Sequence, residues 1–361
     1  SGFSMPLQNI ILKLGLNEVM SKILAIHFKY FGDAVLMTPA LRAIREHFPQ
    51  CELHALVPGE IAPILEHLPW LNRIWAMPRR RGSANLSQTL PIIGALRRER
   101  FDRSVDFVSN DRGAIASLLI GAKERLGWLE SGGFWGRRFC YTRRVAPEIK
   151  RLHESAHLVH LLSGWDVPPP RSLEPEIRAD PALAEAAKKV LPIENAVICH
   201  VASSQPNREW PLSHWAALHR LATAAGYPVV FTTPRGKREQ SLVPEFIKLA
   251  PNATVLPMIS ELPLFLAVLQ RAAVFISGDT GPLHFAAGLG VPTISLFGPS
   301  LPERWAPVGP RHRLLTGTPC SCGAHSAICT NKDHCLAAIS PEQVLNCLQK
   351  ADQDKRRSPH T

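Results

Sequence analysis

Short apolar segments alternate with stretches of helical periodicity along most of the chain. Residues 22–28 and 52–57 have the composition of buried strands, and between them Leu41, Ile44 and Phe48 recur at helical spacing. Parallel strands need a crossover connection, which is usually a helix. The alternation therefore predicts an α/β fold with parallel sheets covered by helices on both faces. The other predicted strands are residues 73–77, 104–108, 196–201, 228–233, 274–277 and 292–297.

A proline-rich segment divides this alternation into two halves. Residues 165–181 contain five prolines and no helical period, which is typical of a linker. A chain of 361 residues is also long for one core, since domains hold about 150 residues each. We predict an N-terminal extension at 1–20, domains at 21–170 and 171–350, and a disordered polar tail at 351–361. We also expect the last helix to pack back on the first domain.

The formal net charge is +11, and the arginine pairs and triplets are concentrated in the first half. A basic balance favours anionic partners such as nucleic acids, acidic lipids and nucleotide sugars. The sequence has neither a dinucleotide fingerprint nor a P-loop. It also has no nucleic-acid-binding motif, so we expect no nucleic-acid partner. With no apolar run near the ~20 residues that span a bilayer and no secretory signal, we expect a cytoplasmic protein.

Ligands of open parallel sheets bind outside the carboxyl ends of the strands, so the turns after the strands are the candidate sites. The first of them contains Gly32 and Asp33. Asp33 has two interpretations: the N-cap of the next helix, or a carboxylate that faces a cleft and takes a proton from a hydroxyl group. Thr38 and Pro39 mark either a second helix start or a bend early in the same helix.

Three more turns of this kind lie in the second half, which makes it the candidate nucleotide-binding half. Ser203, Ser204 and Arg208 offer hydroxyls and a cation that suit a diphosphate. A capped loop is the alternative there. Glu239 can accept hydrogen bonds from a ribose diol, or it is a solvated carboxylate.

The last of these turns has the most specific pattern. Thr280 is a good helix N-cap, and Pro282 fits the first turn, where its missing N–H costs little. The free N–H groups of that helix, with Gly281 and His284 beside them, would point at an anion. Asp279 comes directly before the cap. A polar turn between two buried strands is the alternative.

Five stretches together resemble the bacterial heptosyltransferases, glycosyltransferase family 9. They are GDAVLMTPALRAIREHFP (32–49), RSVDF (103–107), IGAKERLGW (120–128), HVASSQPNREWPLSHW (200–215) and SGDTGPLHFAAGLGVPTISLFGPS (277–300). The resemblance implies a GT-B architecture, in which two Rossmann-like domains face a central cleft. It implies inverting transfer of heptose from ADP-L-glycero-D-manno-heptose to the Kdo or heptose of the lipopolysaccharide inner core.

The resemblance also implies roles for single residues, with Asp33 as the catalytic base. Arg208, standing where many members have lysine, would hold the diphosphate together with Ser203 and Ser204. The donor site would be completed by Asp279, Thr280, Gly281 and His284, with Glu239 on the ribose. The reaction would need no cofactor. The arginine-rich first half would face an anionic acceptor, with Arg112, Arg137 and Arg138 as candidate contacts.

Four cysteines cluster near the end of the chain. Cys320, Cys322, Cys329 and Cys335 have the spacing C-x-C-x6-C-x5-C. Four thiolates can bind zinc or iron tetrahedrally, and similar cysteines occur in many members of the family. The usual zinc pair is C-x2-C, so reduced thiols or a disulfide are the alternatives to a structural metal.

Three other functions remain open. A protein O-heptosyltransferase would keep the fold and the donor but modify a serine or threonine hydroxyl. A nucleotide-sugar epimerase would keep the fold and change the reaction, and a non-enzymatic anion-binding protein is the third alternative. For the leading prediction the partners are an ADP-sugar donor and an anionic lipopolysaccharide-core acceptor. Peripheral contact with the cytoplasmic face of the inner membrane is a further expectation.

Overall fold

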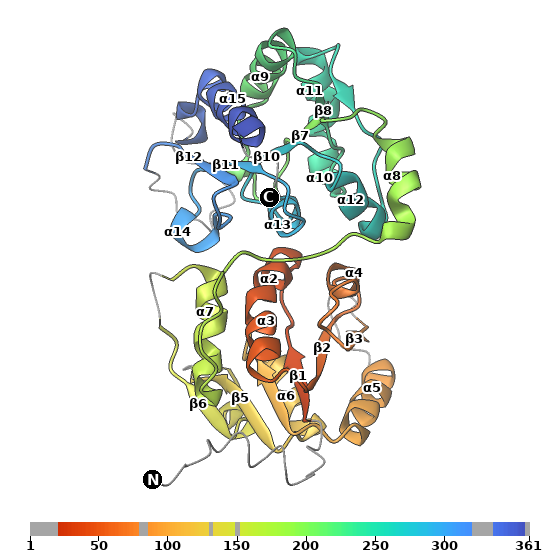
Figure 1. The fold of residues 1–361 in the computed structure, drawn as a ribbon, viewed down its shortest axis with the longest axis vertical. Helices are drawn as coiled ribbons and strands as arrows, with labels where there is room; N and C mark the ends of the chain where they lie inside the picture. Colours follow the sequence, from red (N-terminus) through yellow and green to blue (C-terminus); the bar gives the residue numbers. More distant parts are fainter. Residues whose placement is uncertain (1–20, 79–85, 130–132, 149–151, 320–334, 358–361) are drawn as a thin grey trace, which may run out of the picture.

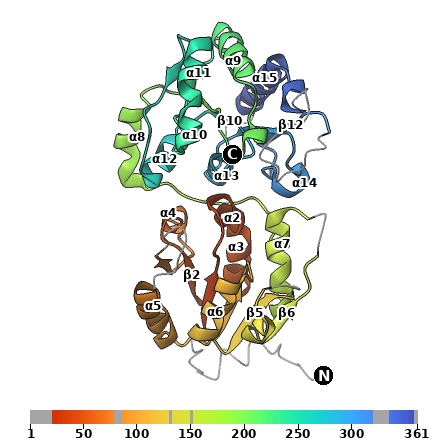
Figure 2. The same ribbon diagram turned by 180° about the vertical axis from the view of Figure 1, so that it is seen from behind.

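The computed structural model describes residues 21–78, 86–129, 133–148, 152–319 and 335–357, which form two α/β domains (Figure 1). The strands of the first domain are β1 (Lys22–Ile26), β2 (Glu52–Pro58), β3 (Arg73–Met77), β4 (Arg103–Asp106), β5 (Glu124–Trp128) and β6 (Arg143–Val145). Its helices are α2 (Phe31–Leu36), α3 (Thr38–His47), α4 (Ala62–Leu65), α5 (Leu86–Arg98), α6 (Asp111–Ile120) and α7 (Glu154–Leu161), with 3-10 turns η1 (Arg137–Cys140) and η2 (Leu162–Trp165). Helices α3 and α7 pack together on the face seen in Figure 1, whereas α5 and α6 pack together on the face seen in Figure 2.

The second domain repeats this organisation. Its strands are β7 (Val197–His200), β8 (Val229–Phe231), β9 (Thr254–Val255), β10 (Val274–Gly278), β11 (Thr293–Phe297) and β12 (His312–Thr316). Its helices are α8 (Ala184–Val190), α9 (Leu212–Ala224), α10 (Lys237–Gln240), α11 (Leu242–Leu249), α12 (Leu262–Leu269), α13 (Gly281–Gly288), α14 (Pro302–Trp305) and α15 (Pro341–Arg357), with 3-10 turns η3 (Pro181–Leu183), η4 (Pro206–Arg208) and η5 (Cys335–Ala338). In the described part of the chain, no helix is long and apolar enough to cross a membrane.

Both sheets have the same strand order. The first is β3-β2-β1-β4-β5-β6 and the second, read from its opposite edge, is β9-β8-β7-β10-β11-β12. Every neighbouring pair of strands is parallel. This is the Rossmann order, in which the direction of winding reverses between β1 and β4 and between β7 and β10. The predicted α/β class is confirmed, and the two switch points are where ligands of such sheets bind.

The central strands carry the burial that their sequences predict. All five residues of β10 are buried, and so are four of the five in β1. Parallel strands covered on both faces consist of nearly continuous apolar residues. The outer strands β3 and β6 are largely exposed or half-buried. The sequence did not predict the edge strands β6, β9 and β12, which need no such pattern, or the internal strand β5, which begins with two half-buried charged residues.

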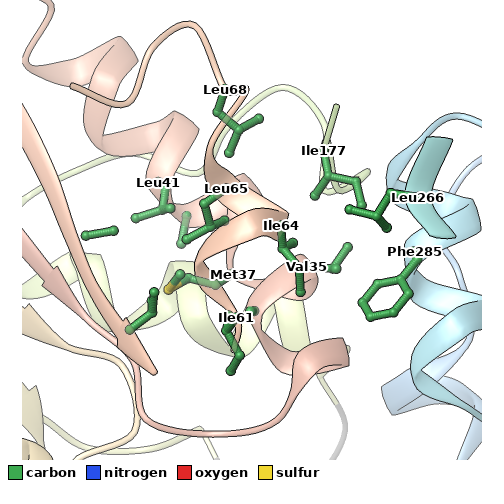
Figure 3. Packing of buried hydrophobic residues seen from close by; sticks show 14 of the residues in the cluster. Val35, Met37, Leu41, Ile61, Ile64, Leu65, Leu68, Ile177, Leu266 and Phe285 are labelled. Carbon is green, nitrogen blue, oxygen red and sulfur yellow. The ribbon is translucent and has the colours of Figure 1, made fainter. Parts of the chain in front are cut away.

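One hydrophobic cluster runs through both domains. Figure 3 shows Val35 and Ile64 of the first domain beside Leu266 and Phe285 of the second, with Ile177 of the linker among them. Helices α2 and α13 pack against each other, and the rings of Phe31 and Phe285 meet edge to face at 6.2 Å between centroids. Since α2 follows β1 and α13 follows β10, this contact brings the carboxyl ends of the two sheets together.

The predicted linker contains neither helix nor strand between η2 and η3, a stretch that the structure describes throughout. Its backbone nevertheless bonds to both domains. The N–H of Glu176 donates to Thr38 Oγ1 at 2.9 Å, and the N–H of Ile177 donates to the Gly288 carbonyl at 2.8 Å. The linker therefore connects α3 and α13 at the level of the domain interface.

Two predictions about the chain's end are wrong. Helix α15 continues to Arg357, so most of the predicted disordered tail is helical. That helix packs on α9 and β11 of the second domain, and not on the first. Val344 and Leu348 are buried there in the second domain's own cluster, which explains why the helix stays with that domain. The predicted extension at 1–20 lies outside the described residues.

Candidate active site

Asp33 lies inside the first turn of α2, which begins at Phe31. The N-cap is Tyr30, whose side chain makes no capping bond, so the N-cap interpretation of Asp33 is wrong. Its carboxylate is nearly buried, and Oδ1 lies 3.2 Å from Lys29 Nζ. A carboxylate in a first helical turn is stabilised by the helix dipole. Thr38 and Pro39 begin a second helix, α3, which is the first of the two alternatives, but Met37 before it has helical backbone angles and no side chain caps the new start.

Lys29 also binds a second carboxylate. Its Nζ lies 3.3 Å from Glu154 Oε1, and Arg304 holds the other oxygen, Oε2, through Nε at 3.0 Å and Nη2 at 2.8 Å. Burial alone would lower the pKa of Lys29, but Asp33 and Glu154 outweigh it and raise that pKa. Burial alone would raise the pKa of Glu154, but Lys29 and Arg304 hold it below its usual value. Lys29 and Glu154 are therefore both charged near neutral pH.

The turn between β10 and α13 lies across the interface. Thr280 is the N-cap of α13 and accepts from the N–H of Leu283, which confirms the predicted cap. Asp279 Oδ2 accepts from Arg208 Nη1 at 2.8 Å, and its Oδ1 lies 3.9 Å from His284 Nε2. Burial lowers the pKa of His284, although Asp279 and Asp33 act in the opposite direction. The buried imidazole is thus neutral near pH 7.

Two glycines allow close approaches at this interface. A Cβ on Gly32 would lie 2.8 Å from His284 Cδ2, so the imidazole packs directly on the backbone of α2. A Cβ on Gly278 would lie 2.7 Å from the carbonyl oxygen of Arg208, so the η4 loop lies against the end of β10. The close approach at Gly32 is therefore a contact between the two domains.

The turn after β7 is held by two residues that the sequence analysis missed. Glu209 Oε1 accepts from the backbone N–H of Ser203 at 2.9 Å and from Arg238 Nη2 at 2.6 Å. Arg238 also donates to the carbonyl of Ser203. Ser203 is buried and Ser204 is exposed. No local pattern could have found this pair, since Arg238 reaches back from α10.

Some of the buried polar atoms without protein partners lie after strands of the second sheet. Among the described residues, the Asn207 side-chain amide, His284 Nδ1 and Ser300 Oγ have no hydrogen-bond partner. Asn207 is 1% exposed. A buried polar group that lacks a partner costs free energy unless water or a ligand satisfies it. These four atoms follow β7, β10 and β11, at the edge of the sheet where ligands of such folds bind.

Glu239 is less well placed than the other predicted donor residues. It lies on α10 with its carboxylate over Gly236, where an added Cβ would overlap it, and 3.8 Å from Arg238. Its connection to the Ser203 turn therefore runs through Arg238. The structure brings Arg208, Asp279 and His284 into direct contact, but Glu239 lies at the margin of the group.

The three candidate acceptor arginines differ in position. Arg112 stacks on Phe28, just after β1, at 4.5 Å from the ring centroid. Arg137 Nη1 lies 3.3 Å from Asp111 Oδ1 at the start of α6. Arg138 is exposed and stacks on Phe139. Arg112, the second residue of α6, and Arg137, which pairs with the first residue, therefore both lie at the start of that helix, whereas the stacking contact of Arg138 is within η1.

A buried carboxylate, Asp106, was also missed. It ends β4 and accepts from the Tyr141 hydroxyl at 2.7 Å and from the N–H of Ser109 at 2.9 Å. Burial raises its pKa to about 6 against these hydrogen bonds. An added Cβ on Gly113 would overlap the carboxylate, so α6 covers it. Asp106 thus supports the turn that presents α6.

The cysteine cluster falls mostly on residues 320–334, outside the described ranges. Cys335 is described and buried. Within the described residues, no group of three or more histidine, cysteine, aspartate or glutamate side chains could hold a metal ion. The predicted metal ligands Cys320, Cys322 and Cys329 stay a prediction.

Comparisons with known proteins give one consistent result. The model of the family described as glycosyltransferase family 9 (heptosyltransferase) matches residues 90–333. Lipopolysaccharide heptosyltransferase 2 of Escherichia coli K12 is 24% identical over 309 residues, which cover 81% of this chain and 87% of that protein.

Two solved structures share the fold. A family 9 glycosyltransferase from Veillonella parvula superposes with a TM-score of 0.78 at 18% identity, over 92% of this chain and 97% of its own. The ADP-heptose lipopolysaccharide heptosyltransferase II of E. coli has a TM-score of 0.76 at 19% identity, over 93% and 99%. The predicted GT-B architecture is thereby confirmed.

Proposed function

The chain belongs to glycosyltransferase family 9, the heptosyltransferases, and from this premise we propose that it transfers heptose from ADP-L-glycero-D-manno-heptose to the lipopolysaccharide inner core. The observation that carries the proposal is a contact across the domain interface between two Gly–Asp segments. They are Gly32–Asp33 at the start of α2 and Gly278–Asp279 before α13. One segment presents Asp33, and the other joins Asp279, Arg208 and His284. A base and an anion site on opposite sides of a cleft fit group transfer between two substrates.

The proposed reaction inverts the anomeric carbon. A hydroxyl oxygen of the acceptor attacks that carbon from the side opposite ADP, and the bond from the carbon to the β-phosphate oxygen breaks. Asp33 takes the hydroxyl proton as the new glycosidic bond forms. Its carboxylate is positioned for this role because it lies nearly buried at the domain interface, held by Lys29.

The departing ADP carries the negative charge that develops. Arg208 and the free N–H groups at the start of α13 would stabilise its diphosphate. Asp279 holds the Arg208 guanidinium in place within the same domain, so the cation is positioned before the donor arrives. The unpartnered atoms of Asn207 and Ser300 are further donors and acceptors for the nucleotide sugar. Ser203, Ser204 and Glu239 stay proposals for the remaining donor contacts.

The acceptor would lie against the first domain. Arg112 and Arg137, at the start of α6, are the better placed of the candidate arginines. Their charge suits the carboxylates and phosphates of a Kdo-containing acceptor. Because that acceptor is anchored in lipid, we propose that the enzyme works at the cytoplasmic face of the inner membrane. Sedimentation with vesicles that contain the acceptor, compared with vesicles that lack it, tests this location.

The test of function measures ADP release from ADP-heptose with and without a Kdo-terminated acceptor. The proposal predicts release that depends on the acceptor, together with a product heavier by one heptose. Turnover of the donor alone would favour the epimerase, and heptose on a protein hydroxyl would favour the protein O-heptosyltransferase. If neither a product nor turnover of the donor is observed, the proposal is overturned.

We further propose a structural zinc or iron on Cys320, Cys322, Cys329 and Cys335, separate from catalysis. Tetrathiolate sites of this kind stabilise the fold of the segment that carries them. Metal analysis of the purified protein should find about one equivalent. Less than about a tenth of an equivalent would remove the metal and leave reduced thiols or a disulfide.

A further inference from the structure

Four charged side chains form a chain of ion pairs that crosses the domain interface. Arg304, on α14 of the second domain, holds Glu154 Oε2 at 2.8 Å. Glu154, the first residue of α7, holds Lys29 through Oε1 at 3.3 Å. Lys29 in turn lies 3.2 Å from Oδ1 of Asp33. A residue of the donor-side domain is thus connected to the proposed base through one carboxylate and one ammonium.

Glu154 is the buried member of this chain. Its side chain is 2% exposed, whereas that of Arg304 is 43% exposed. A buried carboxylate is stable as an ion only when its partners are in place, and removing one of them is costly. Arg304 supplies two of the hydrogen bonds to Glu154. Separation of the domains would therefore take Arg304 away from one oxygen of a carboxylate that is buried in the closed arrangement.

A second contact fixes the same junction. His153 Nε2 lies 3.0 Å from the carbonyl oxygen of Ala306, directly beside the Glu154–Arg304 pair. The short segment from Arg304 to Ala306 therefore contacts the start of α7 at two adjacent points. This arrangement resists small rotations between the domains better than a single exposed ion pair, which contributes little.

We propose that Glu154 is a positioning residue that links closure of the two domains to the placement of Lys29 beside the carboxylate of Asp33. The inference rests on the proposed function, in which Asp33 is the base. With Arg304 in place, the Glu154 charge is compensated from the second domain, and Lys29 is shared with Asp33. Without Arg304, Glu154 competes with Asp33 for Lys29. The base would then have its full surroundings only in the closed protein.

Several charged or titratable groups act on Asp33 and define the electrostatics of this link. Lys29 comes from its own loop, His27 from the end of β1, and His284 from α13. Burial lowers the pKa of His27 to about 4, and the His284 imidazole is also neutral near pH 7. Removal of Glu154 takes a negative charge away from the surroundings of Asp33, and removal of Arg304 takes a positive charge away.

The first test compares Glu154→Gln with Arg304→Gln. Both variants break the bridge, and we expect kcat to fall roughly tenfold in each, because the base is misplaced. The acid limb of the kcat/KM profile reports protonation of the base. Loss of the Glu154 charge should move that limb to lower pH, and loss of the Arg304 charge should move it to higher pH. Shifts of about half a unit are expected for charges at this range.

A matched control removes an arginine from an ion pair far from the cleft. Arg73 begins β3 and pairs with Glu99 at 3.1 Å, at the edge of the sheet away from its carboxyl ends. Arg73→Gln should leave both kcat and the acid limb unchanged. If the acid limbs of Glu154→Gln and Arg304→Gln stay at the wild-type pH, or move in the same direction, the link to the base is wrong and Glu154 is only structural.

The second test needs no substrate and so remains valid if the proposed function fails. Hydrogen exchange is measured on peptides that cover α14 and the first turn of α7. Glu154→Gln and Arg304→Gln should both exchange faster there, because the junction opens more often, and Arg73→Gln should not. Unchanged exchange in both variants would overturn the junction itself. Should Glu154→Gln fold poorly, the more exposed Arg304→Gln still decides the outcome.

Discussion

The two Gly–Asp segments that meet at the domain interface, Gly32–Asp33 and Gly278–Asp279, differ in how their carboxylates are held. Asp279 is fixed within its own domain by Arg208, next to a helix that Thr280 caps. Asp33 follows a helix start without a side-chain cap, and its partner Lys29 is shared with Glu154. One segment is thus complete in a single domain, whereas the surroundings of the other depend on both. We infer that the donor site is preformed and that the base is completed by domain closure.

The sharpest test of this comparison is Asp33→Asn. The amide keeps the shape but cannot take a proton, so kcat should fall roughly a thousandfold, within the range for a lost general base. The affinity for ADP, measured by calorimetry, should change less than about twofold, because the nucleotide contacts lie in the other domain. Retained turnover would exclude Asp33 as the base.

Asp279→Ala should have the opposite kinetic signature. It frees Arg208 from its fixed position and leaves a cation next to a buried imidazole, so the donor KM should rise about ten- to a hundredfold. Asp354→Ala is the control, since Asp354 pairs with Arg313 on the surface of the same domain. A donor KM that stays at the wild-type value, with unchanged kcat, would remove Asp279 from the site.

Gly32→Ala tests the contact between the two segments. The new Cβ would lie 2.8 Å from His284 Cδ2, and the buried ring must move. Such overpacking costs about 1–3 kcal/mol in the free energy of unfolding, and kcat should fall with it. Gly94→Ala, within α5, meets no atom within 4 Å and should be neutral or stabilise by up to about 1 kcal/mol. Equal effects of the two variants in thermal unfolding would contradict a special role for Gly32.

The smallest effect is expected at the helix starts. Thr280→Ala removes the cap of α13 and should cost about 1 kcal/mol, or roughly 2–4 °C in Tm. Tyr30→Ala changes the corresponding position of α2, where the side chain makes no capping bond, and its Tm should match that of the wild type. A loss of stability in Tyr30→Ala but not in Thr280→Ala would reverse the comparison.

Much of this arrangement follows from local sequence. Buried central strands such as β1 and β10 need long apolar runs, and a capped helix start such as Thr280 has a short, specific pattern. The proline-rich linker is equally local. These features are sufficient to predict two parallel α/β domains and the turns that face the cleft.

The partners of the charged residues were decided only by the tertiary structure. Glu154 lies 125 residues from Lys29 and 150 residues from Arg304, and Arg238 reaches back 29 residues to Glu209. Ion pairs over such separations leave no periodic signal, because neither partner's neighbours in the sequence carry information about the other. The sequence thus determined where polar groups follow buried strands, and the packing of α2 on α13 determined which of them meet.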